Sequence, residues 1–261
     1  MARLGASGGV APPLLLLHGY PDNLQIFCRL APLLAASGRL VVAFDWPGMG
    51  ESEVWPGGTT PAHLADRLAV LCDAWDFDRV DLAGMDMGGQ PALAFAARHA
   101  GRIGRLVVMN SLVAPSARTS WEIRVLRRFG WNRALLRTLP RLIFARAERT
   151  FLPPGVRLPE AVRDDLWRSF RRPEVRAFIT RLCGGYDAAL PRLPELYGRI
   201  VCPTLVLWGE HDRHFPPVHA ETLAAALPKA RLEILGRAEH WMVFDRAEEV
   251  AARIAAWRGG G

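Results

Sequence analysis

Short apolar runs that alternate with helix-like stretches are the feature that most restricts the fold of this chain. Runs of strand length lie at Pro13–Leu17, Leu40–Phe44, Val80–Ala83, Leu106–Met109, Thr204–Trp208 and Leu232–Leu235. Helical stretches fit between them at about Leu24–Ala36, Pro61–Trp75, Gln90–His99, His219–Ala226 and Ala247–Trp257. Strands of a parallel sheet are covered on both faces, so they read as continuous apolar runs, and helices usually connect them. The pattern predicts an α/β fold, a mostly parallel sheet flanked by helices.

The alternation stops between residues 111 and 198, where Arg-rich helical stretches are broken by prolines at 140, 153, 154, 159 and 173. We therefore expect a core made of residues 1–110 and 199–261, interrupted by a helical insertion at 111–198. The insertion follows a strand end, where open α/β sheets bind their ligands. We expect it to form a cap over the functional site.

The charge of the chain is uneven, and the insertion is its basic part. The net charge is +7, and residues 111–198 contain 17 Arg against eight Asp and Glu. We interpret these arginines as solvated helix faces, because aromatic residues do not alternate with them as they do in a base-stacking surface. The expected partners are a small apolar molecule and water, and not nucleic acid.

Cysteine spacing and the first residues bear on location and cofactors. Cys28, Cys72, Cys183 and Cys202 are far apart and form no C-x-x-C pair, so neither a disulfide framework nor a zinc site is predicted. The apolar run before His18 lacks a small-residue cleavage site, and no run approaches the roughly 18 apolar residues of a membrane span. We expect a cytoplasmic protein with no metal or other cofactor.

The segment Gly84-Met85-Asp86-Met87-Gly88-Gly89 follows a predicted strand and opens a predicted helix. In a nucleophile elbow, the central residue occupies a strained turn, and small neighbours let the backbone pass close by. The elbow usually carries serine, whereas Asp86 is central here. A carboxylate would attack carbon to give an alkyl-enzyme ester, and a serine would give an acyl ester. The alternative is a glycine-rich turn in which Asp86 is a helix N-cap.

Two further segments complete the chain order nucleophile, acid, histidine that this kind of elbow requires. Asp212 follows the predicted strand Thr204–Trp208, and His240 follows Leu232–Leu235. We predict that Asp86, Asp212 and His240 act together. The alternative for the segment around Asp212 is a metal site at His211-Asp212-Arg213-His214, although no further His or Asp cluster completes a coordination shell.

The loop His18-Gly19-Tyr20-Pro21 follows the first predicted strand and is placed to form an oxyanion hole. The backbone N–H groups of Tyr20 and Met87 are the candidate donors, since a backbone donor tolerates almost any side chain. The alternative is a plain Gly-Pro turn.

Together His18–Pro21, Asp45–Ser52, Gly84–Gly89, Asp212 and His240 resemble the α/β-hydrolase family, especially its Asp-nucleophile branch of epoxide hydrolases and haloalkane dehalogenases. The resemblance covers nearly the whole chain and implies an α/β-hydrolase fold. That family normally starts with additional strands before the His-Gly pair, so we expect a shortened or differently built first edge of the sheet.

Departures from the family pattern bear on the substrate. Haloalkane dehalogenases usually carry Trp after the nucleophile to hold the halide, and this chain has Met87, whose thioether offers no N–H. Some dehalogenases place the catalytic acid at the position of Asn110, and an amide supplies no negative charge. Similarity to the end of an epoxide hydrolase cap implies Tyr186 as proton donor, and the alternative for Tyr186 is an amphipathic interface residue. The usual first cap tyrosine is not evident, and Trp131 or Trp167 falls in its region.

These residues favour an epoxide hydrolase that forms a diol through an ester at Asp86. The second hypothesis is a haloalkane dehalogenase-like carbon–halogen hydrolase, with Trp131 or Trp167 in the substrate site holding the halide. The third is a binding protein or a non-hydrolytic enzyme that kept the pocket. The complete set Asp86, Asp212 and His240 argues against the third.

Overall fold

The strands of the central sheet carry the candidate site at their ends. The computed structural model describes residues 1–5 and 11–257. Within these ranges, seven strands form one sheet in the order β1-β3-β2-β4-β5-β6-β7. The strands are β1 (Ala2–Leu4), β2 (Leu14–Leu17), β3 (Val41–Phe44), β4 (Val80–Met85), β5 (Ile103–Met109), β6 (Thr204–Gly209) and β7 (Ala230–Leu235). All pairings are parallel except that of β1 with β3, which confirms the predicted mostly parallel sheet.

The inner strands are apolar on both faces because helices cover both. Every residue of β2, β3 and β4 is buried, whereas the edge strand β7 is largely uncovered. The first edge is built by β1, a strand that the apolar pattern did not predict. Only three residues long, it runs antiparallel to β3 and pairs Ala2 with Ala43. Its pattern is too short to stand out in the sequence.

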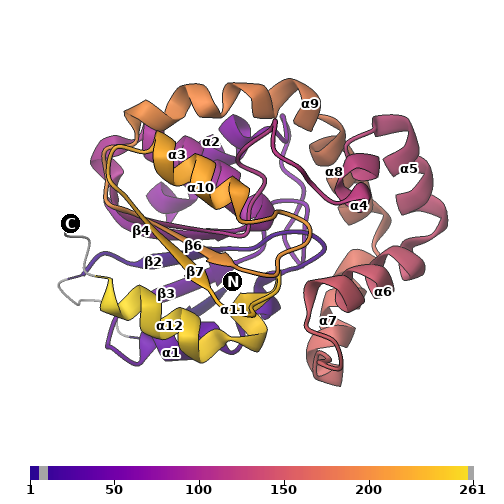
Figure 1. Cartoon of the computed structure of the whole chain (residues 1–261), viewed down its shortest axis with the longest axis horizontal. Helices are drawn as coiled ribbons and strands as arrows, with labels where there is room; N and C mark the ends of the chain where they lie inside the picture. The colour runs from indigo at the N-terminus through magenta and orange to yellow at the C-terminus, as the bar shows by residue number, and fades with distance from the viewer. Residues whose placement is uncertain (6–10, 258–261) are drawn as a thin grey trace.

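Helices form a layer on each face of the sheet (Figure 1). One layer contains α2 (Pro61–Ala74), α3 (Gly89–Arg98) and α10 (Val218–Ala226), and the other contains α1 (Leu30–Ala35) and α12 (Ala247–Ala256). The Thr60 side chain accepts a hydrogen bond from the His63 N–H and caps α2, and Pro61 occupies its first position. There Pro lacks only an N–H that would have no helical partner anyway.

The helix predicted over Leu24–Ala36 is wrong in its first half. A 3-10 turn covers Leu24–Phe27, and α1 begins only at Leu30. This start places Pro32 in the first turn of α1, where no N–H donor is needed. A continuous helix would have put that proline in its interior.

The segment between β5 and β6 is helical, as expected, and lies beside the end of the sheet at which the parallel strands finish (Figure 1). Its helices are α4 (Trp121–Leu126), α5 (Phe129–Thr138), α6 (Pro140–Phe151), α7 (Glu160–Phe170), α8 (Pro173–Gly184) and α9 (Tyr186–Ala189). Pro140 and Pro173 open α6 and α8, and Pro159 precedes α7. These prolines separate the helices because they fit the first turn and not the interior.

In the part of the chain that the structure describes, no helix has the length and apolar character needed to cross a membrane.

Candidate active site

Asp86 lies at the sharp turn between β4 and α3. Its φ angle is 50°, a left-handed value that non-glycine residues rarely adopt and that marks strain at functional turns. A Cβ on Gly84 would lie 2.5 Å from the Gly88 carbonyl oxygen, and one on Gly19 would lie 2.5 Å from Asp86 Oδ2. The turn therefore requires the small residues that the sequence places there, as in a nucleophile elbow.

The Asp86 carboxylate is bound by the loop that follows β2. The backbone N–H of Tyr20 donates a 2.7 Å hydrogen bond to Asp86 Oδ2. Gly88 precedes α3, and no side-chain capping hydrogen bond is made there, so Asp86 is not the N-cap that the alternative interpretation required. The structure thus brings the loop after β2 and the turn after β4 together around one carboxylate.

Burial and nearby charge act in opposite directions on Asp86. The residue is 8% exposed, and burial raises its pKa to about 6, although His240 and the backbone N–H groups of Tyr20 and Met87 lower it. At neutral pH the carboxylate form therefore dominates. Tyr20 and Met87, the two predicted backbone donors, both act on this carboxylate.

His240 and Asp212 meet although 28 residues separate them. His240 Nδ1 lies 2.8 Å from Asp212 Oδ2, and the N–H groups of His214 and Phe215 donate to Asp212 Oδ1 at 2.8 and 3.0 Å. These contacts and the charge of His240 outweigh burial and lower the pKa of Asp212. Burial lowers the pKa of His240, but Asp212 and Asp86 outweigh it and raise this pKa to about 9. Nε2 of His240 is buried and has no hydrogen-bond partner among the described residues.

Asn110 and Ser111 hold this arrangement in place, a role that the motifs did not predict. The Asn110 side chain accepts from the Gly209 N–H at 2.9 Å and donates to the carbonyl oxygens of Glu239 and His240 at 3.0 and 2.9 Å. Ser111 Oγ donates to the Asp86 carbonyl oxygen at 2.5 Å. Asn110 thus ties the ends of β5 and β6 to the histidine loop, and its amide bonds to backbone instead of to the imidazole.

The histidines beside Asp212 face different partners. His211 is exposed and lies 3.6 Å from Glu210, whereas the buried His214 contacts the hydroxyls of Ser120 and Thr150 at 2.9 and 3.0 Å. Nowhere in residues 1–5 and 11–257 do three or more His, Cys, Asp or Glu side chains gather to hold a metal ion. The arrangement does not fit the alternative of a metal site at residues 211–214.

A cavity of about 370 Å³ opens between α4, α5, α6 and the core. Its wall includes Tyr20, whose N–H binds the Asp86 carboxylate, and Phe151 and His214, but not Asp86 or His240 themselves. The Phe151 and His240 ring centroids are 4.3 Å apart. Most of the remaining wall is aliphatic, and the ion pair between Arg146 and Glu122, 2.6 Å apart, supplies its charge. The cavity suits an apolar molecule.

Of the three site residues predicted in the helical insertion, only Tyr186 lies near the turn. It is buried, and burial, Cys183 and Asp86 raise its pKa well above 10, so its hydroxyl keeps its proton. Trp131 is 66% exposed, and Trp167 packs against Phe144 with tilted rings whose centroids are 5.5 Å apart. Neither tryptophan lines the cavity of about 370 Å³, so the structure gives no support to the expectation that they bind the substrate there. Trp131 lies on the exposed face of α5, and Trp167 belongs to an aromatic cluster between α6 and α7.

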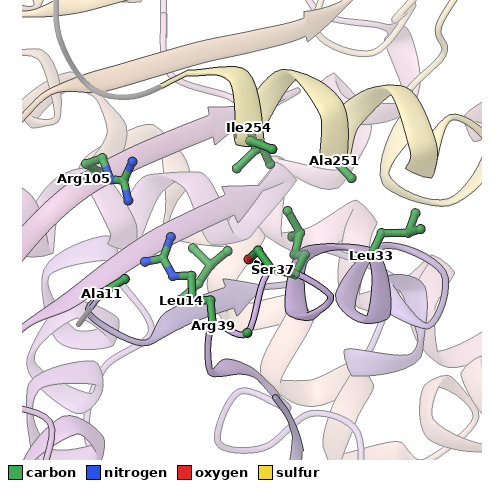
Figure 2. A pocket seen from close by; sticks show the side chains of 11 residues that line it. Ala11, Leu14, Leu33, Ser37, Arg39, Arg105, Ala251 and Ile254 are labelled. Carbon is green, nitrogen blue, oxygen red and sulfur yellow. Dashed lines mark hydrogen bonds between the residues drawn. The ribbon is translucent and has the colours of Figure 1, made fainter. Parts of the chain in front are cut away.

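Figure 2 shows a second cavity, of about 340 Å³, between α1 and α12. Leu14 and Arg39, at the amino ends of β2 and β3, lie on its wall. Asp86 follows the carboxyl end of β4, so this cavity lies at the opposite end of the sheet from the candidate site.

Comparisons with known proteins identify the family of the fold. The family model described as alpha/beta hydrolase fold matches residues 12–247. A 2-hydroxy-6-oxononadienedioate/2-hydroxy-6-oxononatrienedioate hydrolase from Cupriavidus pinatubonensis is 29% identical over 97% of this chain and 89% of that protein. Epoxide hydrolase 3 of Xenopus tropicalis is 28% identical over 94% of this chain and 71% of that protein. The crystal structure of an enol-lactonase from Burkholderia xenovorans has a TM-score of 0.82 at 25% identity, covering 98% and 94% of the two chains.

Hydrolases of 2-hydroxy-6-oxononadienedioate and of 2-hydroxymuconate semialdehyde recur among the relatives, beside the epoxide hydrolase. The comparisons therefore establish the family and the hydrolase reaction type but do not support the Asp-nucleophile branch in particular. The resemblance to the Asp-nucleophile branch therefore depends on the residues of the site alone. The chain belongs to the alpha/beta hydrolase fold family and is a hydrolase of that fold.

Proposed function

We propose that the chain is a hydrolase in which Asp86 forms a covalent ester with its substrate, and that the substrate is an epoxide. The observation that carries this proposal is the 2.7 Å hydrogen bond from the Tyr20 N–H to Asp86 Oδ2. In acyl transfer, the donors of an oxyanion hole must face a substrate oxygen. Here a donor already holds the carboxylate of the protein itself, which suits attack by that carboxylate on a saturated carbon.

In the first step, the free oxygen of Asp86 attacks one epoxide carbon, and the ring carbon–oxygen bond breaks. The departing alkoxide takes the proton of the Tyr186 hydroxyl. The raised pKa of Tyr186 supports this role, because the group is protonated at neutral pH. An alkoxide is a poor leaving group, so a positioned proton donor accelerates its departure.

In the second step, water hydrolyses the ester. Nε2 of His240 takes a proton from water, and the water oxygen attacks the Asp86 carboxyl carbon. The ester bond breaks, and the diol leaves with a proton from His240. Asp86 is left as a carboxylic acid, and the proton that it releases restores Tyr186. Formation of the ester removes the negative charge of Asp86, one of the causes that raise the pKa of His240. The imidazole therefore loses its proton more readily in the ester than in the free protein.

Epoxide hydrolysis is favoured over carbon–halogen cleavage by the same site. A halide leaves without a proton, so it has no use for Tyr186, and it needs N–H donors that hold an anion. Met87, directly after the nucleophile, offers no side-chain N–H donor, and Trp131 is 66% exposed on α5. We also propose that the insertion at 111–198 acts as the cap, because its helices α4, α5 and α6 form most of the cavity wall.

Substrate profiling with trapping of the ester tests the proposal. The purified protein is incubated with apolar epoxides, haloalkanes, aryl esters and 2-hydroxy-6-oxodienoates, and diol, halide, phenol and dienoate loss are measured. We expect diol alone. His240→Gln should accumulate an adduct of epoxide mass on the peptide that contains Asp86, while the parent protein shows none at steady state. An adduct on another residue, or turnover confined to the esters or dienoates, contradicts the proposal.

A further inference from the structure

A third cavity, of about 430 Å³, lies between α5 and α8, two helices of the insertion that pack against each other (Figure 1). Four arginines line it: Arg133 and Arg137 from α5, and Arg176 and Arg181 from α8. Apart from Thr180, the other described residues of its wall are apolar, and none of them is acidic. None of the residues of the candidate active site lines it.

The charge of these four arginines is not balanced by the protein. α5 has no acidic residue, and the only one in α8, Glu174, pairs with Arg172 at 2.8 Å. Within residues 1–5 and 11–257, no ion pair includes any of the four. Other arginines of the insertion do have acid partners, as Arg127 has Asp187 at 2.7 Å. Arginine stays protonated in proteins, and like charges held around one cavity repel each other, so the cavity favours an anion.

The walls of this cavity are fixed relative to each other. The fully buried Asn132 side chain donates from α5 to the Thr180 carbonyl oxygen of α8 at 3.1 Å. Arg176 is held by hydrogen bonds from its side chain to the carbonyl oxygens of Phe170, at 3.2 Å, and of Arg171. Its Nε is buried and has no hydrogen-bond partner among the described residues, although buried N–H groups are nearly always bonded. The site is therefore preformed, and one of its donors still lacks an acceptor.

Arg181 also faces a further cation, Arg67 of α2. The Arg67 side chain donates to the carbonyl oxygens of Trp55 and Pro56 at 3.2 and 3.0 Å. Burial lowers the pKa of Arg67, and the charge of Arg181 lowers it further. The surroundings of Arg181 are therefore positive on the side of the core as well, which adds to the attraction for an anion.

We propose that the cavity between α5 and α8 binds a small molecule that carries two phosphate groups. A phosphate group carries about −1.5 to −2 charges at pH 7, so two of them balance four arginines, whereas a single carboxylate leaves most of the charge unbalanced. The planar guanidinium group also matches phosphate oxygens and can bond them in pairs. The site is independent of the proposed function, because an apolar epoxide and its diol carry no charge for the arginines to bind.

The helix α5 stands between this cavity and the cavity of about 370 Å³. Leu135 and Leu139 line the larger apolar wall of the latter, whereas Arg133 and Arg137 line the phosphate site. A ligand in the phosphate site therefore contacts a helix that also shapes the proposed substrate cavity. Because turnover could change for either reason, binding itself is the measurement that tests the site.

Titration calorimetry of the full chain with inorganic pyrophosphate tests the proposal. We expect one pyrophosphate to bind per chain at low ionic strength, and binding to weaken in added sodium chloride because salt screens the charges. Arg133→Gln and Arg181→Gln, one from each helix, should each weaken binding by about tenfold, the effect of one lost charge-assisted hydrogen bond. The matched control is Arg149→Gln, which removes the same charge from an exposed position of α6 outside the wall and should bind like the parent.

Circular dichroism spectra check that the variants stay folded, as expected for exposed positions. Inorganic phosphate, with one group, and succinate, a dicarboxylate, should both bind more weakly than pyrophosphate. The proposal is overturned if pyrophosphate does not bind the parent, if Arg149→Gln loses as much affinity as the two site variants, or if succinate binds equally well. Vesicles of phosphatidylglycerol and phosphatidylcholine should not bind. Vesicle binding that Arg133→Gln and Arg181→Gln weaken, without pyrophosphate binding, would assign the arginines to a lipid surface instead.

Discussion

The amide N–H of Tyr20 and the Oδ2 atom of Asp86 are 2.7 Å apart, so the backbone of the loop after β2 orients the carboxylate at the turn after β4. The same donor position would bind a substrate oxygen if the turn carried serine. With aspartate it binds the nucleophile, and the second carboxyl oxygen is the one that can attack.

Asp86→Asn should abolish ester formation while the protein stays folded. The amide preserves the shape of the side chain and, like aspartate, tolerates the φ of 50°, but it is a far weaker nucleophile. Ester formation should be undetectable by intact mass, with an unchanged circular dichroism spectrum. Ester formation at the parent rate in freshly purified protein would exclude Asp86 as nucleophile.

Tyr186→Phe should slow ester formation from an epoxide by about 10²–10⁴-fold, the usual contribution of a general acid. The matched control is Tyr197→Phe, because Tyr197 is also buried but donates its hydroxyl to the Val113 carbonyl oxygen. The control should lose about 1 kcal/mol of stability and little activity. Single-turnover rates and urea unfolding measure both effects. Equal rates in the two variants would remove Tyr186 from the mechanism.

The pH dependence of ester formation should reflect the carboxylate of Asp86. With a pKa of about 6, the reactive form is lost as the pH falls through 6, so the rate should drop below that value and level off above it. His240 lowers this pKa, so His240→Gln should move the midpoint to higher pH. Rapid-quench measurements from pH 5 to 9 test both signs. A midpoint near 4 in the parent, or a downward shift in the variant, would contradict the burial argument.

Gly19→Ala should damage the site, because the added Cβ would lie 2.5 Å from Asp86 Oδ2. Overpacking of this kind typically costs about 1–3 kcal/mol of stability, and it pushes the carboxylate away from its donor. Gly101→Ala is the matched control, since a Cβ there meets nothing within 4 Å. We expect the first variant to lose both stability and ester formation and the second to keep both. Similar behaviour of the two variants would show that the close approach at Gly19 is unimportant.

The sheet, the turn at Asp86 and the pairing of Asp212 with His240 could be predicted from the sequence, because each follows from a local pattern of residue types. Each depends on residues close together in the chain: apolar runs buried on both faces, glycines around one central residue, and polar residues directly after strands. Parallel strands end at the same edge of a sheet, so residues that follow them meet without further information. The order of Asp86, Asp212 and His240 was therefore enough to predict their proximity.

What only the tertiary structure decided depends on contacts between distant segments. Trp131 and Trp167 have the residue type expected of a binding site, but helix packing in the insertion turns the first to solvent and the second onto Phe144. Asp22 looks like a polar loop residue in the sequence, and only the fold buries it to 1% exposure. Side-chain direction and burial are properties of the packed chain, because they depend on neighbours that the linear sequence does not place.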